Sequence, residues 1–114
     1  MRVDLLQGTL DMLVLKALSW GSMHGYGIVS WLETMTDAAL TVEEGSLYPA
    51  LHRMAQRGWV TAQWGVSENN RRAKYYTITA AGRRQLQQET KSWARFTEVV
   101  AKVMAGTPVV GGAT

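Results

Sequence analysis

Residues 45–79 read GSLYPALHRMAQRGWVTAQWGVSENNRRAKYYTIT, and this stretch decides how the rest of the 114-residue chain is interpreted. Its first part has apolar residues at the three- and four-residue spacing of an amphipathic helix. Gly58 suits the end of that helix, because glycine tolerates the left-handed conformation often found there. Two runs rich in β-branched and aromatic residues follow, at 59–64 and 73–79, with a polar loop between them. The stretch therefore predicts a helix followed by a β-hairpin.

The predicted helix has two distinct faces when its residues are placed at 100° intervals. Leu47, Leu51 and Met54 fall on one side and are expected to face the core. Pro49 has no backbone N–H to donate, which places it within the first two turns. The opposite side carries hydrogen-bonding groups and no large aliphatic residue. We expect this outer face to comprise Ser46, Pro49, His52, Arg53 and Gln56, with Tyr48 on its flank.

The tip of the predicted hairpin is basic, since Arg71, Arg72 and Lys74 lie within four residues of one another there. Asn69 and Asn70 are residues of the type that shapes tight turns. Cations on a projecting hairpin can neutralise phosphates or enter a narrow groove of DNA. A helix with a polar outer face followed by a basic hairpin is typical of a winged helix-turn-helix on DNA, with the helix in the major groove.

We therefore predict that double-stranded DNA is a partner. Arg53 is the best candidate for recognising guanine, because its planar guanidinium matches two acceptors at once. Ser46, Tyr48 and His52 suit hydrogen bonds to phosphates or base edges. The alternative, a solvated helix face beside an ordinary polar loop, stays open at this point. The candidate DNA-contacting residues are Ser46, Tyr48, Pro49, His52, Arg53, Asn70, Arg71, Arg72 and Lys74.

The composition is that of a single globular domain. Hydrophobic residues make up 46% of the chain and charged residues 18%, so wholesale disorder is not expected. The net charge of +3 is modest, and the clustering of the cations is more informative than their total. The absence of cysteine fits a reducing compartment, and no segment resembles a signal peptide or a membrane span. We expect a cytoplasmic protein that does not associate with membranes.

Sequence patterns of catalytic and metal sites are missing. There is no nucleophile elbow and no phosphate-binding glycine loop. The two histidines, His24 and His52, are too few for a zinc site, and His24 is expected to cap or shape a turn before a glycine. We expect no enzymatic activity, no metal and no cofactor.

The residues before the central stretch predict two helices and a short strand. Thr9 is the expected N-cap of a first helix that ends near Ser19. This helix is apolar nearly all round, so it is expected to be covered on more than one side. A second helix is predicted over residues 26–35. Residues 40–42 are expected to form a very short strand that pairs with the hairpin.

Aromatic residues outside the last helix are expected to pack in the interior. Tyr26, Val29 and Leu32 form the predicted buried stripe of the second helix, with the Tyr26 hydroxyl reaching the surface. Ile28 and Met35 are expected at the edges of that stripe. The tryptophans expected to act as packing residues are Trp20, Trp31, Trp59 and Trp64.

A long final helix is predicted over residues 80–105, with Thr79 as its N-cap. About 25 residues give a helix of about 38 Å, longer than the compact part of a small monomer needs. Its apolar residues recur close to the coiled-coil period and are expected to be buried against a second copy of the chain. They are Leu86, Trp93, Phe96, Val100 and Val103.

The predicted fold is α+β and mainly α: a winged helix-turn-helix with a long C-terminal dimerisation helix. Residues 1–79 form the predicted DNA-binding domain, residues 80–105 the dimerisation helix, and residues 106–114 a flexible tail.

Five blocks of the chain resemble the PadR family of bacterial winged-helix transcriptional regulators, in its compact branch with a single C-terminal helix. The resemblance spans residues 5–103 and implies a homodimer that represses by binding a palindromic operator and is released by a small effector. It also implies that residues 46–57 enter the major groove, while residues 69–74 approach the minor groove or backbone. The matching blocks are LLQGTLDMLVLKAL, HGYGI, EEGSLYPALHRMAQRGWV, WGVSENNRRAKYYTITAAG and the helix around SWARF.

The resemblance also bears on Trp93, because some compact members of that family bind flat aromatic compounds between paired tryptophans at the dimer centre. Two interpretations stay open. Trp93 is either only an anchor of the dimer interface, which we favour, or also one wall of a pocket for a small planar aromatic effector. The candidate effector-binding residues are Trp93, Phe96, Thr97 and Val100. The alternative function is a winged-helix protein-interaction module without specific DNA binding.

Overall fold

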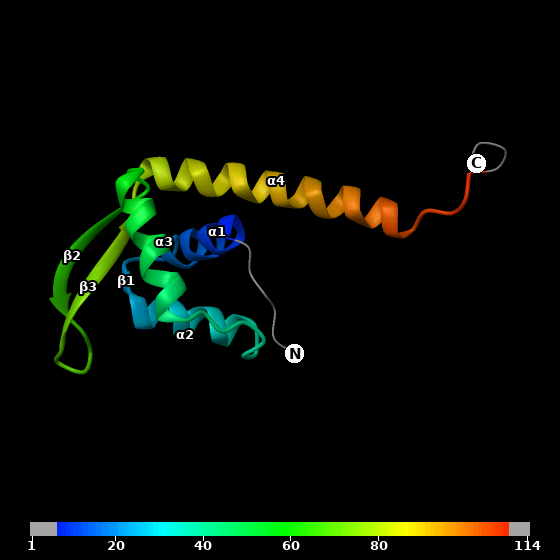
Figure 1. Ribbon diagram of the computed structural model, residues 1–114. Coiled ribbons are helices and arrows are strands. Elements are labelled where there is room, and N and C mark those ends of the chain that lie inside the picture. Colours follow the sequence, from blue (N-terminus) through cyan, green and yellow to red (C-terminus); the bar gives the residue numbers. More distant parts are fainter. Residues whose placement is uncertain (1–6, 110–114) are drawn as a thin grey trace.

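The computed structural model describes residues 7–109 and shows a mainly helical chain with a small antiparallel sheet (Figure 1). This confirms the predicted α+β winged-helix fold. Residues 110–114 of the predicted tail and residues 1–6 lie outside the described residues. The elements are α1 (Gln7–Leu18), β1 (Met23–His24), α2 (Gly25–Met35), α3 (Glu44–Gln56), β2 (Val60–Val66), β3 (Arg72–Ile78) and α4 (Ala80–Met104).

The core lies where α1, α2 and α3 meet the base of the sheet. The predicted inner face of α3 is confirmed: Leu47, Leu51 and Met54 are fully buried. Helix α1 is buried on several sides, as its nearly uniform apolarity predicted. Its buried apolar residues are Leu10, Val14, Leu15, Ala17 and Leu18.

Two of the predicted helix caps are present and one is not. His24 Nδ1 accepts a hydrogen bond of 3.0 Å from the Gly27 N–H and caps α2. Thr79 Oγ1 accepts one of 3.0 Å from the Gly82 N–H and caps α4. The prediction of Thr9 as the first N-cap is wrong, because the chain is already helical at Gln7.

The sheet has the order β1-β3-β2, and its third strand is not the predicted one. β1 pairs with β3 through Met23 opposite Tyr76 and His24 opposite Tyr75. The prediction of a strand at 40–42 is wrong, because the edge of β3 is already occupied by the residues directly before α2. Leu40 and Val42 are instead buried in the core without strand structure.

Several aromatic residues predicted to be interior are exposed. Helix α2 begins at Gly25 and buries Gly25, Ile28 and Leu32, which lie on one face at helical spacing. Tyr26 lies about 100° away from Gly25 on the helix and is 74% exposed, so its placement in the core was wrong. Trp20 and Trp64 are also exposed, at 68% and 56%, whereas Trp31 and Trp59 pack against the core as predicted.

Helix α4 passes very close to the base of the hairpin at Gly82. A Cβ atom at this position would collide with the Trp59 carbonyl oxygen and lie 2.8 Å from Ile78 Cγ1. The Trp59 carbonyl also accepts a 2.9 Å hydrogen bond from the Thr79 N–H, so the backbone there has little freedom to move. The absence of a side chain therefore sets how α4 leaves the sheet.

Replacing Gly82 by alanine is expected to lower the free energy of unfolding by about 1–3 kcal/mol, because overpacking exceeds the gain in helix propensity. Gly8→Ala in α1 is the matched control, because a Cβ at Gly8 meets nothing within 4 Å. Urea denaturation of both variants measures the difference. Equal stabilities would show that α4 and the hairpin separate without penalty.

Candidate nucleic-acid interface

The outer face of α3 is open to solvent along its length. Pro49, His52 and Gln56 are exposed, as the helical spacing predicted. Ser46 is exposed near the start of the helix, and Tyr48 is 44% exposed on the flank nearest the hairpin. The hydroxyl of Tyr48 lies against Gly25 at the start of α2, where a Cβ atom would be only 2.5 Å from it. This face offers hydroxyl and imidazole groups on a rigid helix.

Arg53 lies on the other flank of α3 and points toward α1. Its Nη2 donates a 2.9 Å hydrogen bond to Asp11 Oδ1, and the two side chains are 26% and 10% exposed. This differs from the predicted outward placement. A helical wheel gives the direction of Cβ, whereas the long arginine side chain turns back to the only buried carboxylate of the described core. Burial raises the pKa of the Asp11 carboxyl, and the Arg53 guanidinium opposes that shift.

Arg53→Ala is expected to destabilise the protein by about 1–3 kcal/mol, because it leaves the Asp11 carboxylate without its guanidinium partner. A raised pKa means that the folded state disfavours the charged carboxylate at neutral pH, so stability should recover as falling pH protonates Asp11. Urea denaturation at neutral and mildly acidic pH measures both effects.

Gln56→Ala, on the exposed face of the same helix, is the control for the Arg53 variant. The combination Asp11→Ala with Arg53→Ala should lose less stability than the sum of the two single changes. Additive losses that are equal at both pH values would contradict a coupled pair.

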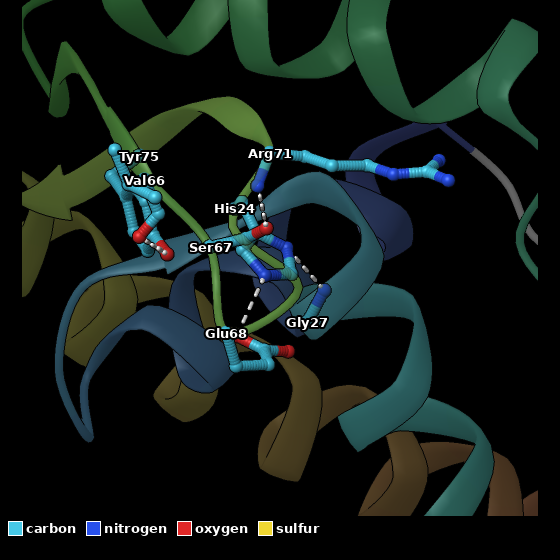
Figure 2. A network of polar contacts seen from close by, with 7 residues as sticks. All are labelled: His24, Gly27, Val66, Ser67, Glu68, Arg71 and Tyr75. Carbon is cyan, nitrogen blue, oxygen red and sulfur yellow. Dashed lines mark hydrogen bonds and ion pairs between the residues drawn. The ribbon is translucent and has the colours of Figure 1, made fainter.

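The hairpin of β2 and β3 is the wing of the fold, and its tip is a closed turn. The Ser67 N–H donates to the Arg71 carbonyl at 2.8 Å, and the Asn70 N–H donates to the Ser67 carbonyl at 2.9 Å. Asn70 has φ 58°, a left-handed conformation that asparagine adopts more readily than most residues. The predicted turn-shaping role of Asn70 is confirmed. The Tyr75 hydroxyl donates to the Val66 carbonyl at 3.2 Å and braces the strand ends (Figure 2).

One histidine connects the wing to the body of the domain. While Nδ1 of His24 caps α2, its Nε2 lies 3.6 Å from Glu68 Oε2 in the wing tip (Figure 2). The rings of His24 and Tyr75 also pack in an edge-to-face arrangement, with centroids 5.3 Å apart. The backbone N–H of Glu68 and then His24 lower the pKa of the Glu68 carboxyl. These contacts link the wing tip to the start of α2.

A groove of roughly 730 Å³ lies between the wing and the start of α2 and α3. Four of the predicted DNA-contacting residues line it: Tyr48, Arg71, Arg72 and Lys74. The aromatic side chains of Tyr26 and Trp64, which had been assigned to the core, line it too. Period-2 alternation places Trp64 on the same strand face as buried Val60, but alternation does not show where the core ends along the strand.

The predicted DNA-contacting residues therefore fall into four groups. The wing cations and Tyr48 share the groove, while Ser46, Pro49 and His52 occupy the exposed face of α3 beside it. Asn70 shapes the turn at the wing tip and does not line the groove. Arg53 is engaged with α1 on the far flank. Within residues 7–109, no group of three or more histidine, aspartate or glutamate side chains is placed to hold a metal ion.

Helix α4 carries a second feature, a stripe of exposed apolar side chains. The described helix runs on past α1 (Figure 1), and the molecule measures 68 × 31 × 22 Å. Trp93 and Phe96 are 46% and 58% exposed, and their ring centroids are 6.0 Å apart. They line a shallow pocket of roughly 330 Å³ between α1 and α4, whereas Thr97 and Val100 do not. None of the described helices is long and apolar enough to cross a membrane.

Comparison with known proteins places these features in a family. Residues 14–88 match the model of the transcriptional regulator PadR-like family. The chain resembles the solved structure of a transcriptional regulator from Clostridium thermocellum, with a TM-score of 0.79 and 29% identity over 88% of this chain and 97% of that chain. For a PadR-like transcriptional regulator from Bacillus cereus, the TM-score is 0.75 and the identity 29% over 90% and 97% of the two chains.

A sequence relative extends the similarity to most of the chain. An uncharacterized protein from Lysinibacillus sphaericus is 28% identical over 105 residues, which cover 92% of this chain and 96% of that protein. The family match covers the helix-turn-helix, the wing and the first part of α4. The chain belongs to the PadR-like family of transcriptional regulators.

Proposed function

We propose that this protein is a dimeric repressor that binds a pseudo-palindromic operator in double-stranded DNA. The observation that carries the proposal is the juxtaposition of the exposed face of α3 with the basic groove of the wing. A helix of this kind fits the major groove, and a basic wing beside it fits the backbone or the minor groove. Membership of a family of transcriptional regulators supports it.

The residues have distinct roles in this proposal. Ser46, Tyr48, Pro49 and His52 contact base edges or phosphates from α3, while Asn70 shapes the wing tip. Arg71, Arg72 and Lys74 neutralise phosphates. Arg53 is bonded to Asp11 of α1, so its proposed contact with a guanine requires the guanidinium to turn from Asp11 toward the exposed face of α3.

A second copy of the chain would cover the apolar stripe of α4. Exposed contiguous apolar surface of this kind marks an interaction site in a soluble protein. Two copies joined along α4 would hold two α3 helices about 34 Å apart, one turn of DNA, which is the spacing that a two-fold-symmetric site requires. The operator would then be a pseudo-palindrome.

The proposed effector is a small planar aromatic compound bound at the dimer centre by Trp93 and Phe96, with Thr97 and Val100 nearby. The two exposed rings support this site, because a flat aromatic ligand stacks favourably on an exposed aromatic face. A ligand shifts the equilibrium between DNA-binding and released dimers only through different affinities for the two. Saturating effector should therefore weaken operator binding by the factor by which operator weakens effector binding.

Fluorescence anisotropy with labelled duplexes from the DNA upstream of its own gene tests the function. The affinity should fall steeply as salt rises, because bound cations displace counterions from phosphates. It should also exceed the affinity for a mixed-sequence duplex of equal length. Weak binding with little salt dependence would instead favour a protein-interaction module that uses the same fold.

A further inference from the structure

Trp64 is the large aromatic residue of the wing, and its position is not explained by the core. It lies in β2 directly opposite Lys74 of β3, and its side chain is 56% exposed. Tyr76 and Val60, nearer the base on the same face of the hairpin, are 7% and 2% exposed. Toward the hairpin tip, the same face of the hairpin no longer packs against the core and lines the groove instead. Trp64 therefore buries little of its surface and contributes little to the stability of the folded state relative to its size.

Two cationic side chains of the wing lie over the ring of Trp64. The guanidinium carbon of Arg72 lies 4.5 Å from the ring centroid, and the Lys74 ammonium lies 5.9 Å from it. The strand register explains both contacts, since Lys74 is directly opposite and Arg72 is one diagonal step toward the tip. A cation placed over an aromatic face gives up side-chain freedom before any ligand arrives, so less entropy is lost on binding.

The charge of the groove indicates what fits it. Arg71, Arg72 and Lys74 line it, and the carboxylate of Glu68 beside them is directed to His24. Tyr26 and Tyr48 also line the groove, and these residues are 74% and 44% exposed. A groove lined by cations and tyrosine side chains suits a strand of sugar-phosphate backbone, because phosphates bind arginine, lysine and tyrosine side chains.

We propose that Trp64 is a positioning residue that holds Arg72 and Lys74 over the groove, where one strand of the duplex backbone passes between the wing and the two tyrosines. This inference rests on the proposed binding of DNA. Trp64 acts through the two cations, so its aromatic face, rather than its volume or its burial, is the property that matters.

The test compares Trp64→Leu with Trp64→Phe by anisotropy on the upstream duplex. Trp64→Leu removes the aromatic face and should weaken binding about fivefold for each wing, while Trp64→Phe should restore most of the affinity. The dependence of affinity on salt should stay as in the unmodified protein for both, since every cation remains. Trp20→Leu is the matched control, because Trp20 is 68% exposed, carries Lys16 over its ring at 4.9 Å and lies outside the groove.

Tryptophan fluorescence distinguishes a contact between DNA and the wing from a change in the stability of the protein. Adding duplex should change the tryptophan emission of the unmodified protein more than that of Trp64→Phe, because Trp64 lies in the groove that the backbone fills. Unchanged binding by Trp64→Leu, or an equal loss in Trp64→Phe, would overturn the positioning role while leaving the regulator proposal intact. Absence of salt-dependent binding by the unmodified protein would contradict the proposed function itself.

Discussion

Replacing Arg71, Arg72 and Lys74 together by glutamine is expected to weaken duplex binding by about a hundredfold or more at physiological salt. All three side chains line the groove of the wing, and a dimer would present two such wings. If every cation neutralises a phosphate, the slope of log affinity against log salt should become shallower by about five. Anisotropy at several salt concentrations measures both the affinity and the slope.

The matched control for the wing variant removes the same charge elsewhere. Lys91, Arg95 and Lys102 are exposed on α4, away from the groove, and their replacement by glutamine should alter the slope little. Equal losses in the two triple variants would mean that net charge alone attracts DNA. The wing would then have no special place in the interface.

Introducing glutamate at both Phe96 and Val100 is expected to give monomers at micromolar concentration and to weaken operator binding by about a hundredfold or more. These side chains are 58% and 40% exposed on the apolar stripe of α4, and a dimer would bury two copies of each charge. Sedimentation velocity measures the mass, and anisotropy measures the affinity. A monomer loses the gain in affinity that two linked half-site contacts provide.

Glutamate at both Ala94 and Ala101 is the control for the dimer variant. Both residues are exposed on α4, to one side of the stripe, and the change in charge is identical. This control should remain dimeric. Dimers in both variants, or monomers in the unmodified protein, would contradict assembly along α4.

Local sequence patterns predicted the elements that build the interface. The inner face of α3, with Leu47, Leu51 and Met54, follows from helical spacing because burial in a helix repeats every three to four residues. The cap at Thr79 and the helix end at Gly58, which has φ 76°, follow from side-chain chemistry and backbone conformation at single positions.

The features that sequence analysis missed depend on contacts distant in the chain. The strand Met23–His24 has two residues, too few for an alternating pattern, and exists only because β3 offers an edge. Arg53 turns inward because Asp11, 42 residues earlier, supplies a buried carboxylate. Periodicity describes one element at a time and carries no information on such partners.

The exposed aromatic residues illustrate a second limit. Tyr26 and Trp64 are large aromatic residues, and the expectation that they pack in the interior rests on the large area such side chains bury. Their exposure depends on where α2 begins and on how far the hairpin extends past the body. The start of α2 and the projecting end of the hairpin together form the groove, and both positions are set by the assembled fold.

Hydroxyl-radical footprinting on the DNA upstream of its own gene tests the central claim most directly. If two copies present α3 and the wing together, the backbone should be protected in two equivalent patches related by a pseudo-two-fold axis and separated by about one helical turn. Each patch should weaken when the wing cations are removed. A single unsymmetrical patch, or protection that is unchanged in the wing variant, would contradict the account.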